Sequence, residues 1–152
     1  MFQLSDVARS MRTYIDHRAR EHGVTRAQWA VLARLERQEG MMQTEIAEAL
    51  EIQPISLVRL IDRLCDQRLV ERQPHPHDRR ANRLYLTDRG RTMLADLTPL
   101  GREIAGEILA SIGEDEAAEL LHKLLRIKEN IRRASSRRAT KGAPSQGVRH
   151  AR

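Results

Sequence analysis

The feature that most constrains this chain is a change of hydrophobic period in its middle. Before and after this middle part, apolar residues recur three or four positions apart, which is the spacing of an amphipathic helix. Helical segments are expected at residues 4–15, 26–38, 43–50, 54–67, 88–111 and 114–134. Between the fourth and the fifth, strand-like runs at 69–73 and 83–86 flank a segment, 74–82, that is rich in turn residues. The sequence therefore predicts a mainly α fold with one small β-hairpin that has a long basic tip.

Capping residues support several of these boundaries. Thr25 and Thr87 are each placed to cap the helix that follows, and Asp88 is favourable at the positive end of a helix dipole. Pro54 suits a first helical turn, because the N–H that proline lacks would be unpaired there. We therefore expect helices to begin close to these residues.

Size and composition bound the class of protein. A chain of 152 residues fits one compact domain with a helical extension. No apolar run approaches the roughly 18 residues of a membrane span, and the first residues lack the apolar stretch of a signal peptide. The single cysteine, Cys65, excludes a framework of internal disulfides. We expect a soluble cytoplasmic protein with no membrane partner.

The net charge of +6 belongs to the end of the chain. Residues 132–152 hold seven Lys and Arg and no acid. All 21 Asp and Glu and the other 20 basic residues lie in 1–131, which therefore have a net charge of −1. Residues 135–152 also lack apolar periodicity, so they predict a disordered basic tail. A nucleic-acid surface on the folded body must therefore be argued from the position of its arginines.

Residues 43–86 follow the order of a winged helix-turn-helix: a short helix, a turn, a second helix and a hairpin. The second helix, the recognition helix, buries one face and shows the other to base edges in the major groove. The buried stripe is expected to be Ile55, Val58, Ile61, Leu64 and Cys65. Arginine can donate two hydrogen bonds to guanine, and a narrow minor groove attracts arginines of a hairpin tip. Asp62 is placed to pair with a neighbouring arginine. The candidate DNA-binding residues are Gln53, Ser56, Leu57, Arg59, Arg63, Asp78, Arg79, Arg80 and Arg83.

Four stretches of the sequence are distinctive: TRAQWAVL at 25–32, LVRLIDRL at 57–64, LVER at 69–72 and DRRANRLYLT at 78–87. They closely resemble the MarR family of transcriptional regulators, and within it the SlyA-like branch. The resemblance covers about residues 4–133. It implies an obligate homodimer with interlocked first and last helices, and two winged modules on a pseudo-palindromic double-stranded DNA. It also implies that helix 54–67 enters the major groove, that Arg80 enters the minor groove and that Asp78 helps to hold the wing tip.

The resemblance sets expectations for the domains and for two unusual positions. Residues 1–24 and 100–134 are expected to form the helical dimerisation region, and 25–99 the winged helix-turn-helix. Members of the family usually have Thr or Ser before the short helix and Gly in the turn, where this chain has Met42 and Glu51. If the turn geometry is kept, Glu51 adopts a left-handed conformation at a cost on the order of 1 kcal/mol relative to Gly.

A small-molecule site is a further candidate. In relatives that bind phenolic carboxylates, pockets form where the first helices meet the DNA-binding module. The candidate ligand-binding residues for a small aromatic carboxylate effector are Arg9, Arg12, His17 and Trp29, an indole wall beside cationic groups. The alternative interpretation places Trp29 in the core and leaves the arginines solvated or at a dimer interface.

Other chemistries have little support in the sequence. His75, His77 and Asp78 on a turn, without a further ligand cluster, are too few to predict a metal site. Cys65 is expected to pack inward rather than to sense oxidants, although a redox role stays open. We find no Ser-His-Asp pattern, phosphate-binding glycine loop or zinc spacing, so we expect neither an enzyme nor a cofactor.

The sequence thus predicts a homodimeric, nucleoid-associated regulator, either a repressor or a counter-silencer, that a small aromatic anion releases from a pseudo-palindromic operator. Two alternatives stay open at this point. One is a sequence-tolerant architectural DNA-binding protein, whose affinity comes mainly from the basic tail and the hairpin arginines. The other is a winged-helix module for protein–protein contacts that has lost DNA binding.

Overall fold

The computed structural model describes residues 2–141, apart from the side chains of residues 79, 80 and 138–141. The elements in chain order are α1 (Phe2–Glu21), α2 (Arg26–Arg37), β1 (Met41–Met42), α3 (Gln43–Leu50), α4 (Pro54–Asp66), β2 (Val70–His75), β3 (Asp78–Leu86), α5 (Asp88–Ile108) and α6 (Glu114–Lys141). The chain divides into two compact units, one ending at Ala105 and the other beginning at Gly106. No helix among the described residues is both long and apolar enough to cross a membrane. The predicted mainly helical fold with one hairpin is confirmed.

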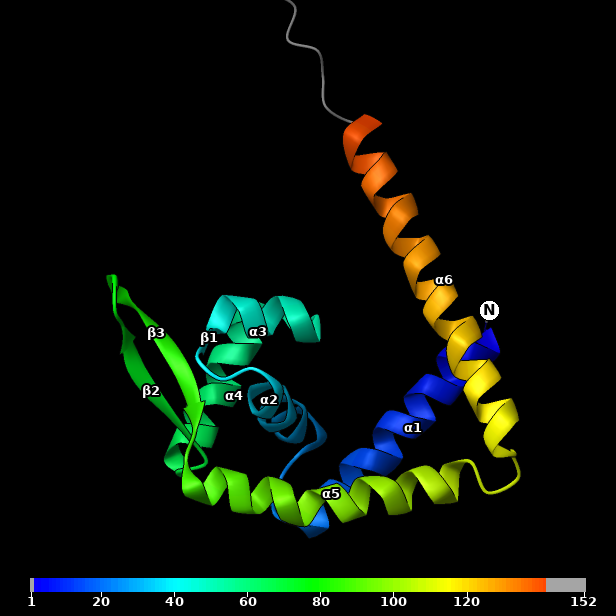
Figure 1. The fold of residues 1–152 in the computed structure, drawn as a ribbon, viewed down its shortest axis with the longest axis horizontal. Coiled ribbons are helices and arrows are strands. Elements are labelled where there is room, and N and C mark those ends of the chain that lie inside the picture. The colour runs from blue at the N-terminus through cyan, green and yellow to red at the C-terminus, as the bar shows by residue number, and fades with distance from the viewer. Residues whose placement is uncertain (1, 142–152) are drawn as a thin grey trace, which may run out of the picture. The chain divides into compact units, whose positions relative to one another are not determined.

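Three strands form a small antiparallel sheet in the order β1-β3-β2. The sequence did not indicate β1, which pairs Met41 with Leu84 and Met42 with Arg83. In Figure 1 the β2–β3 hairpin extends away from α2, α3 and α4. The hairpin tip is shorter than expected, because β2 continues to His75 and β3 begins at Asp78. The prediction of a long tip over 74–82 is therefore wrong: all of those residues except Pro76 and His77 lie in β2 or β3.

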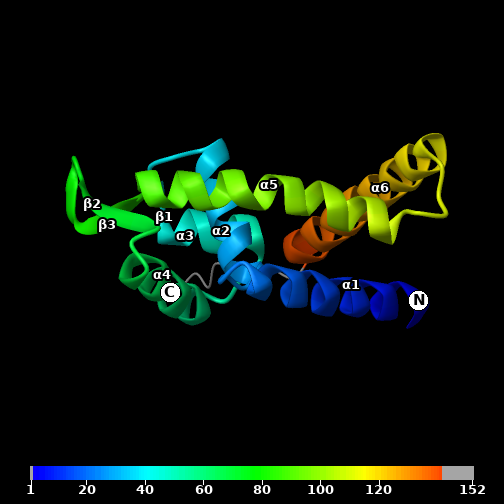
Figure 2. The same ribbon diagram turned by 90° about the horizontal axis from the view of Figure 1, so that it is seen from below.

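The core of the first unit lies between the helices and the base of the sheet. Its fully buried large side chains are aliphatic, as the scarcity of aromatic residues requires: Leu32, Leu35, Ile46, Leu57, Ile61, Leu64, Leu69, Leu84 and Leu97. The helix α5 starts beside the base of the hairpin (Figures 1 and 2). There Gly90 lies so close to Leu69 that a Cβ at Gly90 would be 2.0 Å from the Leu69 carbonyl oxygen. Only glycine allows this approach of α5 to the chain that leads into β2.

The predicted helix starts are confirmed at their caps. The hydroxyl of Thr25 accepts a hydrogen bond from the backbone N–H of Gln28, whose side chain in turn accepts one from the N–H of Thr25. The hydroxyl of Thr87 accepts from the N–H of Gly90 at 3.0 Å and donates to the carbonyl of Arg68 at 2.6 Å. Pro54 occupies the first turn of α4. These reciprocal bonds satisfy N–H groups that a helix start leaves unpaired.

The helix α6 continues past the boundary expected at Ala134 and ends at Lys141. The expected tail over 135–152 is therefore wrong for its first part, since Ala, Arg and Lys at 134–141 are good helix formers and extend the preceding helix. Residues 142–152 lie outside the described part of the chain. The division after Ala105 also leaves α1 in the same unit as the helix-turn-helix. Within that unit the backbone N–H of Arg26 donates to Asp16 of α1, and Arg18 pairs with Glu103 of α5.

Candidate nucleic-acid interface

The turn between α3 and α4 has the left-handed geometry that the sequence analysis required of Glu51. Glu51 has φ 54° and ψ 40°. Its N–H donates to the Glu48 carbonyl and the N–H of Ile52 donates to the Ala47 carbonyl, at 3.2 and 2.9 Å. This pair of bonds is the Schellman motif that usually ends on glycine. The helix-turn-helix geometry is therefore kept despite the side chain of Glu51.

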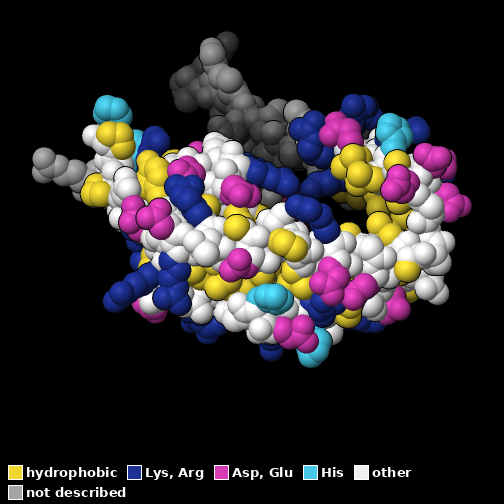
Figure 3. Space-filling view, turned by 60° about the horizontal axis from the view of Figure 1, so that its bottom comes forward, with side chains coloured by type: hydrophobic (Ala, Val, Ile, Leu, Met, Phe, Trp, Pro, Cys, Tyr) yellow, Lys and Arg dark blue, Asp and Glu magenta, His cyan; other side chains and the backbone are white. Residues whose placement is uncertain are grey.

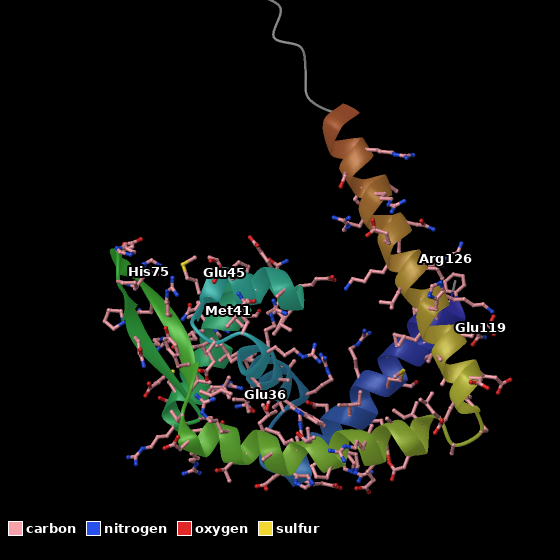
Figure 4. The ribbon with its side chains drawn as sticks, in the orientation of Figure 1. Glu36, Met41, Glu45, His75, Glu119 and Arg126 are labelled. Atoms are coloured by element: carbon pink, nitrogen blue, oxygen red, sulfur yellow. The ribbon has the colours of Figure 1, made fainter. Side chains whose placement is uncertain are left out.

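The start of α3 compensates for its lack of a capping hydroxyl. Met42 occupies the position before the helix and has no polar side chain to accept from the first N–H groups. The carboxylate of Glu45 instead accepts from the backbone N–H of Met42 at 2.7 Å. Figure 4 shows Met41 and Glu45 at this end of α3, next to β1. The acidic residue is also favourable at the positive end of the helix dipole.

The orientation of α4 differs from the predicted one. Leu57 is only 1% exposed and packs inward with Ile61 and Leu64, whereas Ile55 is 67% and Val58 38% exposed. The expected inward stripe was therefore wrong at Ile55 and Val58, and Leu57 is a core residue rather than a DNA-facing one. The pattern was ambiguous because apolar residues at 55, 57, 58, 60, 61 and 64 cover more than half of the helix circumference. Tertiary packing selects which part of that arc is buried.

The polar candidates in α4 and at its N-cap are on the surface of the first unit. Gln53, Ser56, Arg59 and Arg63 are all exposed. Lys and Arg side chains gather over the part of the molecule that contains α4, at the lower left of Figure 3. The prediction that Asp62 pairs with an arginine is confirmed: its carboxylate accepts from Arg72 of β2. This hydrogen bond raises the pKa of the Arg72 guanidinium above its ordinary value, and it links α4 directly to the hairpin.

The other end of α4 is anchored by a polar contact that the sequence analysis missed. Gln28 of α2 is 5% exposed, and its side-chain N–H donates to the side-chain oxygen of Gln67 at 2.9 Å. Gln67 caps the C-terminus of α4. The sequence contains no signal for this contact, because the two glutamines are 39 residues apart. The contact fixes α4 against the helix whose N-terminus Gln28 also caps.

The hairpin holds the remaining DNA-binding candidates. Asp78 begins β3 and is exposed, and the backbone of Arg79 and Arg80 continues that strand. Arg83 is half-buried, and its Nη2 lies 3.1 Å from Nε2 of His75 on the paired strand. Figure 4 shows His75 near the far end of the hairpin. The structure thus places the candidates on one two-stranded arm, with Arg83 in contact with the opposite strand.

The candidate effector residues are only partly brought together. Arg9 and His17 line one open hollow on α1, together with Ser10, Thr13 and Tyr14. Arg9 pairs with Asp6, and His17 is 3.7 Å from Glu21. Arg12 is exposed and does not line this hollow. Trp29 packs toward Gly101 of α5: a Cβ added at Gly101 would lie 3.3 Å from Cζ2 of Trp29. The predicted indole wall with cationic groups is therefore not a single cavity in this unit.

The described part of the chain supports neither a reactive cysteine nor a metal site. Cys65 is half-buried, and burial raises the pKa of its thiol, against the opposing effect of the Arg72 charge. A thiol shifted in this direction is a weaker nucleophile at neutral pH. Among residues 2–141 no group of three or more His, Cys, Asp or Glu could hold a metal ion.

Comparisons with known proteins agree with this geometry. A sequence model of the MarR family matches residues 22–81. A MarR transcriptional regulator from Methanosarcina mazei Go1 is 26% identical, and the match covers 87% of this chain and 95% of that one with a TM-score of 0.79. The transcriptional regulator SlyA is 24% identical over 85% of this chain and 91% of its own, with a TM-score of 0.76. A mutant of MarR from E. coli complexed with operator DNA is also 24% identical, over 82% and 90%, with a TM-score of 0.76. Residues 22–81 are thus similar to the MarR family, and the chain shares the winged helix fold of solved MarR-type transcriptional regulators.

Proposed function

We propose that this chain acts as a homodimeric repressor or counter-silencer that binds a pseudo-palindromic operator. The observation that supports this most directly is the two-sided character of α4. Leu57, Ile61 and Leu64 fix one face in the core, and Arg59 and Arg63 are exposed on other faces of the same helix. A helix fixed in this way can enter the major groove without losing its packing.

Base reading is assigned to the exposed polar residues of α4. Gln53 and Ser56 lie at its N-terminal end, which contacts base edges in helix-turn-helix proteins. Arg59 and Arg63, one helical turn apart, can each donate two hydrogen bonds to O6 and N7 of guanine, worth about 1–3 kcal/mol of discrimination each. Asp62, on the same helix, has its carboxylate paired with Arg72 of β2.

The hairpin is assigned to the minor groove. Its strand β3 contains Asp78, Arg79, Arg80 and Arg83, and the arm extends away from α4 and α3 (Figure 1). A narrow minor groove has a strong negative potential that attracts arginine. The contact of Arg83 with His75 and the bond between Arg72 and Asp62 stiffen the arm and its base. A stiff arm places its arginines at a fixed distance from the recognition helix.

Dimerisation is assigned to the exposed apolar faces of α1 and α6. On α1 the exposed apolar residues are Phe2, Leu4, Val7, Met11 and Tyr14, and on α6 they are Leu120, Leu121, Leu124, Leu125, Ile127 and Ile131. Soluble monomers rarely expose so many large apolar side chains at helical spacing. A second copy of the chain would cover these faces and would supply the second recognition helix that a pseudo-palindrome needs. The half-site spacing expected for such a dimer is about 34–36 Å.

The test is selection of duplexes from a random library with the full chain, followed by competition against random duplex. We expect a pseudo-palindrome that competes at least a thousandfold better than random DNA. Arg59→Ala should weaken binding to it by about tenfold or more, and Arg80→Ala should weaken it as well. Arg102→Ala, an exposed arginine of α5, is the control and should change little.

Each alternative predicts a different result. Equal binding of selected and random duplexes would replace the proposal with a sequence-tolerant architectural protein. In that case affinity would fall steeply with salt, by a slope of roughly 0.9 for each phosphate neutralised. No DNA binding at all, with Arg59→Ala and Arg80→Ala both harmless to the biological function, would favour a protein–protein module.

For the effector we propose a small aromatic carboxylate at the hollow on α1. Arg9 and His17 line it, and Tyr14 offers an aromatic side chain. The probe is a hydroxybenzoate added to the complex of protein and selected duplex. We expect release of DNA at millimolar concentration, and loss of that response in Arg9→Ala. Release that persists in Arg9→Ala and His17→Ala would locate the effector elsewhere, and no release would remove it from the proposal.

A further inference from the structure

The recognition helix exposes two apolar side chains that its own core does not use. Ile55 is 67% and Val58 is 38% exposed. They lie three residues apart, so they share one face of α4. The core positions of the same helix are already filled by Leu57, Ile61 and Leu64. Packing within this unit therefore does not account for the apolar side chains of Ile55 and Val58.

Helix geometry places Ile55 in the middle of the outward face. With 3.6 residues per turn, Ile55 lies about 160° around the helix from the buried Leu57. Arg59 lies about 40° from Ile55 and one turn further along, because the two are four residues apart. The apolar side chain is thus a direct neighbour of a base-reading arginine. Val58 flanks it on one side and Ser56 on the other.

The chemistry of the major groove offers one kind of partner for such a side chain. The edges of the bases there are hydrogen-bond donors and acceptors, except for the C5-methyl group of thymine. We infer that Ile55, flanked by Val58, reads a thymine methyl in each half-site and so determines part of the operator sequence. This inference rests on the proposed function, since it requires α4 to enter the major groove. The expected half-site has a thymine within a base pair or two of the guanine that Arg59 contacts.

A protein partner fits this surface less well than DNA does. Two side chains cannot provide the roughly 800 Å² that each partner buries in a stable interface. The arginines at 59 and 63 lie on the same exposed part of the helix and match the charge of a phosphate backbone. Charged residues are depleted in the centre of protein interfaces, whereas protein–DNA interfaces are strongly positive.

The test removes the methyl group from one side and the isoleucine from the other. Each thymine of the selected duplex is replaced in turn by deoxyuridine, symmetrically in both half-sites, and Kd is measured by fluorescence anisotropy. At one position we expect wild-type protein to bind about fourfold more weakly for each methyl removed, the effect of burying one apolar carbon. Ile55→Ala should weaken binding to the thymine duplex by at least the effect of both methyl groups, about sixteenfold, and should no longer distinguish thymine from deoxyuridine.

Two control variants separate reading from folding. Arg59→Ala should weaken binding yet keep the full response to deoxyuridine, because it leaves Ile55 in place. Ile55→Val, which keeps a branched apolar side chain, should keep most of the response. The thermal unfolding midpoint of Ile55→Ala should match that of wild type, since the side chain is mostly exposed.

The failures are distinguishable. Wild-type protein that prefers no selected duplex overturns both the proposed function and this inference. Wild-type protein that binds its duplex, but responds to deoxyuridine at no position, overturns the inference alone. The same holds if Ile55→Ala responds as wild type does, or if Ile55→Ala changes the oligomeric state, which would make this face a contact between copies.

Discussion

Two regions of this chain use aliphatic residues in opposite ways. In the first unit the helices α2, α3 and α4 and the base of the sheet bury most of their apolar residues against one another, with Ile55 and Val58 of α4 as exceptions. In α6 the apolar residues recur at the same spacing, yet those named above are 38–62% exposed. The first region is complete within one chain, whereas the second has an apolar face without a partner in its own unit. Periodicity therefore shows that a helix has an apolar face, but it does not show what covers that face.

The largest effect is expected where α5 packs closely against the chain that leads into β2. Gly90→Ala should destabilise the first unit by about 3 kcal/mol, the upper range for overpacking. The new Cβ would lie 2.0 Å from the Leu69 carbonyl oxygen, which is backbone and cannot turn away. Urea unfolding followed by circular dichroism measures the change.

The matched control is Gly106→Ala in the same helix. A Cβ there meets nothing within 4 Å. Because alanine has the higher helix propensity, this variant should be neutral or stabilised by up to about 1 kcal/mol. Equal effects of the two substitutions would contradict the close approach of α5 to the chain before β2.

The second prediction concerns the exposed apolar face of α6, and it rests on the proposed homodimer. Leu124→Glu places a charge in the middle of the apolar face of α6. We expect the mass in solution to fall from two copies to one, and operator affinity to fall by about a hundredfold as the second module is lost. Multi-angle light scattering gives the mass and anisotropy gives the affinity.

The control for that variant is His122→Glu, which lies about 160° around the same helix from Leu124. It adds an acid on the polar side and should leave the dimer intact. A dimer that survives Leu124→Glu would show that α6 does not form the interface. The exposed apolar face of α6 would then not be explained by a second copy of the chain.

The third prediction concerns the turn that positions α4. Glu51→Gly should stabilise the first unit by roughly 0.5–1 kcal/mol, because Gly removes the left-handed strain but increases the entropy of the unfolded chain. Glu48→Gly, at an exposed helical position of α3, should instead destabilise it by about 1 kcal/mol. Thermal unfolding of the two variants compares them directly, and destabilisation by Glu51→Gly would contradict the left-handed turn.

Much of the fold could be predicted from local signals. Thr25, Pro54 and Thr87 mark helix starts through bonds to nearby backbone, so the sequence around each of them contains the whole cause. The two-residue strand β1 could not be predicted in this way. It exists only because Met41 and Met42 meet Leu84 and Arg83, about forty residues further on.

The candidate site was predictable in its location but not in its orientation. The order of elements predicted a helix at 54–67, which is α4 (Pro54–Asp66), and the pairing of Asp62 with an arginine followed from charge. The assignment of Leu57 to DNA and of Ile55 and Val58 to the core was wrong, because the α4 sequence is apolar around too much of its circumference. The face of α4 that is buried depends on the packing of Leu57 and on the contact of Gln28 with Gln67. Both involve residues that are distant in sequence.

The smallest expected effect lies on the polar side of α6. Arg132 and Arg133 both donate to the carboxylate of Glu129, at 2.9 and 2.8 Å. These hydrogen bonds lower the pKa of Glu129 from 4.5 to about 2. A depressed carboxylate pKa stabilises the helix above pH 4.5, and this stabilisation is lost as the pH falls toward 2.

An NMR titration of the Glu129 carboxyl group should therefore show a midpoint well below 4.5 in wild type, and one closer to 4.5 in Arg132→Gln with Arg133→Gln. High salt should move the wild-type midpoint in the same direction, because these ion pairs lie at the surface, where salt screens them. A wild-type midpoint at 4.5 would mean that these pairs do not persist in solution. The polar side of α6 would then be supported by the pair of Lys123 with Glu119 and by the acidic residues of its first turn, without a contribution from Glu129.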